Sequence, residues 1–84
     1  MDERVEHWFN RRYGIARRDV YLIRTPMGWQ VLGREGGSEG REVAHYFDEE
    51  GVARQMLRRM LETVPSGQDN WALMSGNAVR DRET

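Results

Sequence analysis

The chain has 84 residues, of which 38% are hydrophobic and 32% are charged, and its formal net charge is −1. A chain of this length can build one modest core, so a deep, enclosed active site is not expected. The absence of cysteine excludes disulfides, thiolate metal sites and thiol nucleophiles. The near-neutral charge also lacks the basic excess that is typical of nucleic-acid-binding domains.

The first residues are charged and contain no apolar run of the kind found in signal peptides. No stretch approaches the roughly 18 apolar residues of a membrane span. We therefore expect a cytoplasmic protein. All 13 basic residues are arginine, which suits bidentate recognition of anions. The same bias also arises from the GC-rich codons of arginine, and the sequence leaves both explanations open.

Residues 2–13 are predicted to form an amphipathic helix. Val5, Trp8, Phe9 and Tyr13 follow the i, i+3, i+4, i+8 spacing of one helix face. Gly14 stands where a left-handed residue would end such a helix.

Three strands are predicted next, over residues 20–25, 29–34 and 41–47. The first is rich in β-branched and aromatic residues, and the other two alternate apolar with polar side chains. A Pro-Met-Gly turn ending at Gly28 joins the first two strands. The glycine-rich segment 35–40 joins the second and third. Connections this short predict an antiparallel meander.

A second helix is predicted over residues 49–63. Asp48 is a favourable N-cap, and acids follow it in the first turn. Apolar residues line one face of the segment, and Pro65 and Gly67 would end it. The following Trp71 belongs to an apolar patch that is too short to classify.

We therefore expect an α+β fold in which a three-stranded antiparallel meander carries two helices on one face, in the order α-β-β-β-α. Residues 1–75 would form the single domain and residues 76–84 a flexible tail. One face of the sheet would then remain open. The side chains expected in the core are Trp8, Phe9, Leu22, Trp29, Val31, Phe47, Met56, Leu57 and Leu61.

The order helix, three strands, helix resembles the double-stranded RNA-binding domain over roughly residues 2–63. In that family the second helix opens with a basic patch that contacts phosphates. This chain has Asp48, Glu49 and Glu50 at the matching positions. The resemblance thus implies the fold, while the acidic residues differ from the family's phosphate-binding pattern.

A shorter block, residues 29–61, is similar to the strand, strand, helix units of arm-binding domains in phage integrases. It also resembles small bacterial immunity proteins, whose hairpins end in Phe-Asp before a helix. Trp29, the glycine-rich loop and the pair Phe47 and Asp48 are the shared features. These resemblances imply DNA binding in one case and neutralisation of a toxin in the other.

Charge is distributed unevenly along the chain. Residues 11–24 contain five arginines against Asp19 alone, and residues 35–50 contain six acids against Arg41 alone. Each region could steer a partner of opposite charge. The candidate protein-binding acids are Glu35, Glu39, Glu42, Glu49 and Glu50. The candidate nucleic-acid-binding residues are Arg11, Arg12, Arg17, Arg18 and Arg24.

His45 and the acids that follow it form the one cluster of possible metal ligands or acid–base groups. Asp48 is assigned to a cap, so we expect no metal site, no cofactor and no catalysis. His7 is expected to pair with Glu3 on the surface of the first helix. The loop at residues 33–37 lacks the helix and lysine of a phosphate-binding loop.

These observations predict a small non-catalytic protein-binding module, of the adaptor or toxin-neutralising kind, that uses the acidic loop and the open sheet face. The alternative is a DNA- or RNA-binding module that uses the arginines between Arg11 and Arg24. Homodimerisation is a further possibility, because an open sheet face can accept a second copy. No membrane partner is expected.

Overall fold

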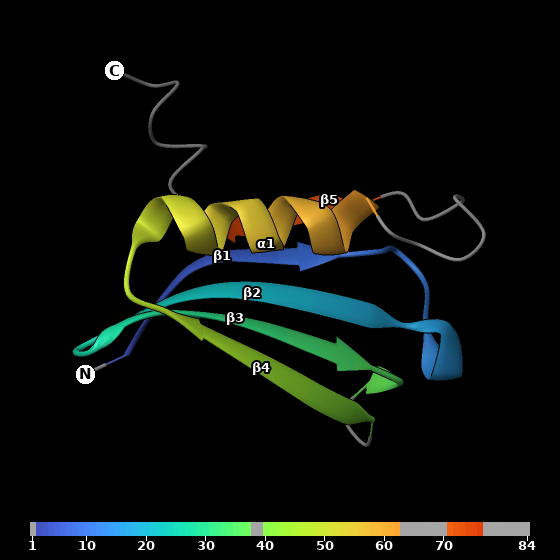
Figure 1. The fold of residues 1–84 in the computed structure, drawn as a ribbon. Coiled ribbons are helices and arrows are strands. Elements are labelled where there is room, and N and C mark those ends of the chain that lie inside the picture. Colours follow the sequence, from blue (N-terminus) through green and yellow to red (C-terminus); the bar gives the residue numbers. More distant parts are fainter. Residues whose placement is uncertain (1, 38–39, 63–70, 77–84) are drawn as a thin grey trace.

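The computed structural model describes residues 2–37, 40–62 and 71–76. They form a five-stranded antiparallel sheet with one α-helix. The sheet order is β4-β3-β2-β1-β5. Helix α1 lies across one face of the sheet, and no described element covers the opposite face (Figure 1).

The three predicted strands and the second predicted helix are confirmed. Strand β2 spans Arg18–Thr25, β3 spans Gly28–Glu35 and β4 spans Arg41–Phe47, and α1 spans Glu50–Glu62. Gly28 has a φ of 145°, as the tight turn between β2 and β3 requires. The N-cap predicted at Asp48 does not form: α1 begins two residues later, at Glu50, and the Asp48 side chain accepts no hydrogen bond from any described residue.

The prediction of a first helix is wrong. The segment forms strand β1, Glu3–Phe9, which pairs with β2 on one side and β5 on the other. The pairing with β2 is irregular between Arg4 and Glu6, so the neighbours Val5 and Glu6 are both buried. This bulge interrupts the alternation of a strand and leaves the apolar residues at helix-like spacing.

A further correction concerns the segment after α1, because Ala72–Gly76 forms the edge strand β5. Gly76, which was expected to open the tail, is therefore the last residue of a strand. The other tail residues lie outside the described part of the chain. The order is thus a short 3-10 turn (η1, Gly14–Ala16) and five strands with one helix, not α-β-β-β-α.

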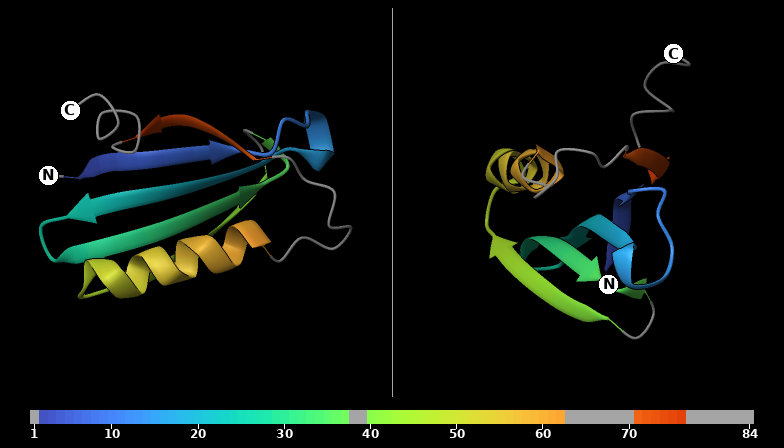
Figure 2. Two further views of the ribbon diagram at one scale, coloured as in Figure 1. Left: turned by 90° about the horizontal axis from the view of Figure 1, so that it is seen from above. Right: turned by 90° about the vertical axis from the view of Figure 1, so that its right-hand side faces the viewer.

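The core lies between α1 and the sheet. Figure 2 shows the helix and the strands from above and from the side. Leu22 and Val31 are fully buried on adjacent strands, and Leu57 of α1 packs against them. Burial of each such side chain contributes about 1.5–3 kcal/mol. The predicted core residues Trp8, Trp29, Phe47, Met56 and Leu61 are partly buried around this centre. Phe9 is also buried, but it faces the other side of the sheet.

A buried carboxylate joins the first strand to the helix. Glu6, only 6% exposed, accepts a hydrogen bond from Arg54 Nη1 at 2.8 Å and another from Trp8 Nε1 at 2.9 Å. Arg54 also donates to Glu50 one turn earlier, at 2.7 Å. Since an unpaired buried charge is costly, this cluster fixes where α1 lies on the sheet.

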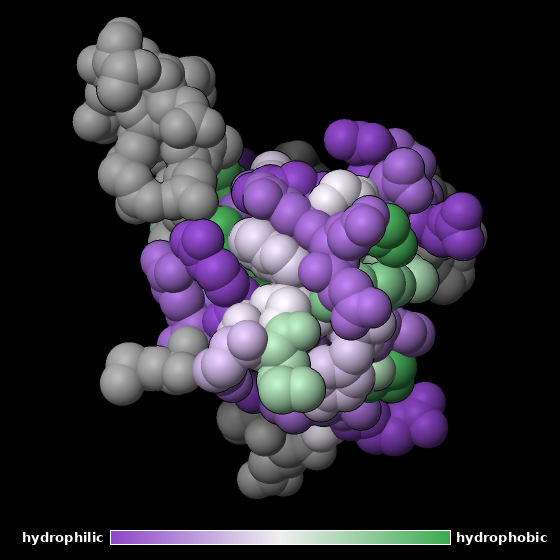
Figure 3. Space-filling model, turned by 60° about the vertical axis from the view of Figure 1, so that its left-hand side comes forward, coloured by the Kyte–Doolittle hydropathy of each residue, from purple (hydrophilic) through white to green (hydrophobic). Residues whose placement is uncertain are grey.

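Asn10 holds the connection from β1 to β2. Its side chain is 1% exposed, donates to the carbonyl of Ala16 at 3.0 Å and accepts from the backbone N–H of Arg18 at 2.9 Å. The loop that contains Arg11 and Arg12 is thereby closed upon itself. On the opposite side of the molecule, where the β2–β3 turn and the start of α1 lie, the surface is mainly hydrophilic, with hydrophobic side chains in small separate patches (Figure 3).

Candidate functional site

The open face of the sheet is built from the side chains that alternate with the core residues. Antiparallel partners point to the same side of a sheet. Phe9, Asp19, Arg34 and Glu42 form one cross-strand row from β1 to β4, and this row lies on the face away from Leu22. The next two rows on this face are His7, Tyr21, Leu32 and Ala44, and then Arg4, Ile23, Gln30 and Tyr46.

Asp19 is the centre of this face. Its side chain is 1% exposed and accepts hydrogen bonds from His7 Nε2 at 2.7 Å, Arg17 Nε at 2.8 Å and Arg17 Nη2 at 3.1 Å. Burial by itself would raise the pKa of Asp19, but the hydrogen bonds from Arg17 and His7 outweigh it and hold the pKa below its usual value. The carboxylate is therefore ionised, and His7 Nε2 carries the shared hydrogen.

Aromatic rings surround this cluster, and guanidinium groups cover them. The rings of His7 and Tyr21 stack with centroids 4.3 Å apart. Arg4 lies 4.4 Å from the centroid of Tyr21, and Arg17 lies 4.4 Å from that of Phe9. Tyr21 is only 5% exposed as a result, although no described element covers this face. The contacts are attractive because a cation interacts favourably with the face of a ring.

Arg34 extends the layer toward the edge strand. It donates to Glu42 Oε2 from Nε at 2.9 Å, and its guanidinium lies 5.9 Å from the Tyr21 centroid. Beyond it, Tyr46 is 72% exposed and accepts a hydrogen bond from Gln30. The open face is thus an ordered layer of arginines and rings with an exposed tyrosine at one margin.

The structure separates the predicted basic residues. Arg17 is bound to Asp19, Arg24 lies 3.1 Å from Glu3, and Arg18 lies 3.9 Å from Glu35. Arg11 and Arg12 are exposed in the loop before η1. Most of the positive charge in this stretch is therefore balanced within the molecule.

The predicted acidic residues do not form one surface either. Glu42 lies on the open face, whereas Glu35 lies on the helix face, where its cross-strand partner is Arg41. Glu49 is exposed before α1, and Glu50 pairs with Arg54. Glu39 lies outside the described residues.

The two histidines differ from the sequence-based expectation in different ways. His45 is half-buried on the helix side of β4, opposite Val31. His7 contacts Asp19 and Tyr21 in the sheet and not Glu3 on a helix. Within the described ranges, no three histidine, aspartate or glutamate side chains come together as metal ligands.

No protein-family model matches this chain, and neither a curated protein nor a solved structure matches it. In the part of the chain that the structure describes, no helix is both long enough and apolar enough to cross a membrane.

Sequence reasoning missed the cluster around Asp19. Asp19 was identified only as the one acid among five arginines, and that isolation was the available signal. His7 was assigned to a helix, which placed it on the wrong neighbours. Had residues 3–9 been assigned to a strand, cross-strand pairing with residues 19–24 would have brought the two side chains together.

Proposed function

We propose that this chain is a non-catalytic protein-binding module and that the open sheet face is its contact surface. The single observation that supports this is the layer in which Arg4, Arg17 and Arg34 cover Tyr21 and Phe9. Arginine and aromatic residues are enriched at protein interfaces and dominate their binding energy. Acids of the β3–β4 region would contribute at the margin, through Glu42.

The layer is also held in place before any partner arrives. Asp19 fixes Arg17 and Glu42 fixes Arg34, so these long side chains have less conformational freedom to lose on binding. Tyr46, beside them and largely exposed, would supply the apolar contact. His7 contacts the carboxylate of Asp19 and the ring of Tyr21, and these two contacts orient its imidazole within the layer.

The test is capture from a native lysate with matched variants. Tyr46→Glu places a charge on the open face, whereas Val52→Glu makes the same kind of change at an exposed apolar position on α1. We expect one protein to be captured by the wild type and by Val52→Glu and to be lost with Tyr46→Glu. Equal capture by all three, or recovery of nucleic acid without a protein, would contradict the proposal.

The second candidate is nucleic-acid binding at the end of the molecule that holds η1. Arg17 and Arg34 line a hollow of about 550 Å³ with Tyr13, which is 74% exposed. Arg11 and Arg12 are exposed in the loop that leads to it. Cations beside an exposed ring would suit a phosphate next to a stacked base.

Arg17 supports the fold through Asp19, so the informative variant is the double change Arg11→Ala and Arg12→Ala. Titration of a labelled single-stranded oligonucleotide should show affinity that falls steeply with salt and is reduced in the double variant. Arg58→Ala, on the exposed side of α1, is the control for loss of charge elsewhere. No binding at low salt would exclude this candidate.

A further inference from the structure

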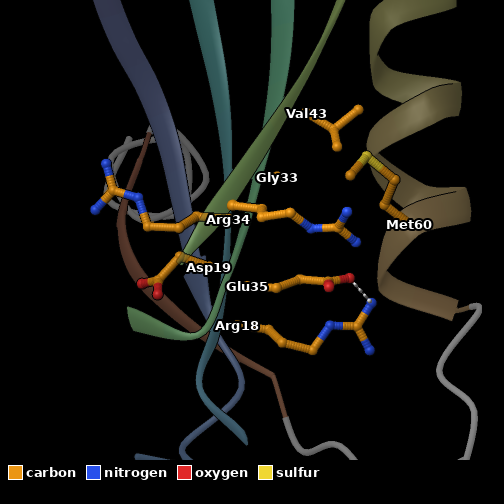
Figure 4. A pocket seen from close by; sticks show the side chains of 8 residues that line it. Arg18, Asp19, Gly33, Arg34, Glu35, Val43 and Met60 are labelled. Atoms are coloured by element: carbon orange, nitrogen blue, oxygen red, sulfur yellow. Dashed lines mark ion pairs between the residues drawn. The ribbon is translucent and has the colours of Figure 1, made fainter. Parts of the chain in front are cut away.

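A second hollow lies on the other side of the sheet, where the end of α1 meets β3 and β4. Its volume is about 270 Å³. Figure 4 shows the side chains around it, which come from four elements. Their roles differ, since some form an apolar floor and others a charged rim.

The floor is formed by Gly33, Val43 and Met60. A Cβ atom on Gly33 would lie 2.6 Å from Met60 Cε. Because Gly33 has no side chain, the methyl group of Met60 can occupy this space. Val43, across from Gly33 on β4, is 55% exposed. An apolar surface that no other described residue covers therefore forms the base of the hollow.

The rim is positively charged. Arg18 and Arg41 line it together with Glu35. Arg18 Nη2 is 3.9 Å from Glu35 Oε2, which is too long for a hydrogen bond. The side chain of Arg41 makes no ion pair or hydrogen bond with any residue in the described ranges.

Two other residues border the hollow without adding charge to it. The side chains of Asp19 and Arg34 point away from it, toward the open face (Figure 4). There they bind Arg17 and Glu42. Among the residues that the structure describes, the groups that face the rim are therefore the guanidinium groups of Arg18 and Arg41 and the carboxylate of Glu35.

We propose that this hollow binds a small organic acid, with its carboxylate on Arg41 and its apolar body on Met60 and Val43. A guanidinium group matches a carboxylate with two parallel hydrogen bonds. Small-molecule sites typically combine an apolar lining with a few polar groups that fix orientation. The volume, somewhat below the usual range for such sites, suits a short chain or a single ring.

This proposal goes beyond the proposed function and is independent of it, because the two surfaces lie on opposite faces of the sheet. A variant at Arg41 leaves Tyr46 and the layer around Asp19 unchanged. Loss of one activity would therefore not imply loss of the other.

The experiment is a titration of the full chain, followed by NMR chemical shifts, with three probes. Octanoate carries both a carboxylate and an apolar chain, 1-octanol carries the chain without the charge, and acetate carries the charge without the chain. We expect saturable shifts at Gly33, Val43 and Met60 with octanoate, and at least about tenfold weaker binding of the other two.

Variants then test each half of the site. Arg41→Ala should weaken octanoate binding about tenfold by removing the charged contact. Gly33→Ala should weaken it by moving the Met60 methyl group into the hollow. Arg58→Ala, an exposed arginine elsewhere on α1, should bind octanoate as the wild type does.

Thermal unfolding of each variant shows which of them remain folded at the assay temperature. If Gly33→Ala is unfolded there, octanoate binding by Arg41→Ala alone tests the site. Octanoate binding that is unchanged in Arg41→Ala would overturn the proposal. So would equal affinity for 1-octanol, or the absence of saturable shifts in the wild type.

Discussion

The Asp19 carboxylate lies 2.7 Å from His7 Nε2, and this contact joins β1 to β2 on the face of the sheet that α1 does not cover. Asp19 is almost fully buried there, with Arg17 as its other partner. Burial of a charged group is tolerated only while its hydrogen-bond and ion-pair partners are present. The cluster is therefore as important to the fold as to the surface.

Replacement of Asp19 tests this dependence. Asp19→Ala should destabilise the protein by about 3–5 kcal/mol, because it leaves Arg17 and His7 without their common acceptor. Glu42→Ala is the matched control, since its pair with Arg34 is exposed and should contribute less than about 1 kcal/mol. Urea unfolding measures both changes, and equal effects would show that burial of Asp19 adds nothing.

Acid stability should depend on the same carboxylate. The pKa of Asp19 is lower in the folded state than its ordinary value of 3.8, so its ionisation stabilises the fold above that pH. This contribution should fall progressively below about pH 4, where the carboxylate of the unfolded chain binds a proton first, and should be lost once the folded carboxylate is protonated as well. The unfolding free energy, measured between about pH 6 and pH 3, should decline more steeply in the wild type than in Asp19→Asn. Parallel profiles would contradict the expectation.

Glu6 and Glu50 both bind Arg54, but only Glu6 is buried. Glu6→Gln should cost about 3 kcal/mol or more, since it removes the charge that balances Arg54 and weakens the bond from Trp8. Glu50→Gln should cost about 0.5 kcal/mol, as expected for an exposed pair four residues apart in a helix. Thermal or urea unfolding of the two variants distinguishes them, and a larger effect at Glu50 would reverse the assignment.

Two tryptophans provide a comparison of satisfied and unsatisfied donors. Trp8 Nε1 donates to Glu6, whereas the buried Nε1 of Trp71 has no hydrogen-bond partner in the part of the chain that the structure describes. Trp8→Phe should therefore destabilise the protein by about 1–3 kcal/mol more than Trp71→Phe. Only the first change removes a hydrogen bond, and it leaves the buried Glu6 carboxylate with one donor fewer. Equilibrium unfolding of the two variants gives this difference directly. A greater loss with Trp71→Phe would indicate that its indole N–H is bonded.

The sequence by itself determined β2, β3, β4 and α1, because short-range patterns predict each of them. Apolar and polar side chains alternate in the strands, an apolar stripe with Leu57 at its centre runs along the helix, and Gly28 permits the turn between β2 and β3. It also identified Leu22, Val31 and Leu57 at the centre of the core, but not the buried Val5, Val20 and Ala53. These features depend on short-range spacing, which a single chain displays along its own length.

Tertiary structure decided the rest. Residues 3–9 have the apolar spacing of a helix, but they pair with β2 and β5 through a bulge that buries both Val5 and Glu6. Only that pairing places His7 on Asp19 and Arg54 on Glu6, over 12 and 48 residues of sequence. Charge blocks that look separate along the chain are divided between faces or balanced in pairs, because strand register, not sequence distance, determines which side chains meet.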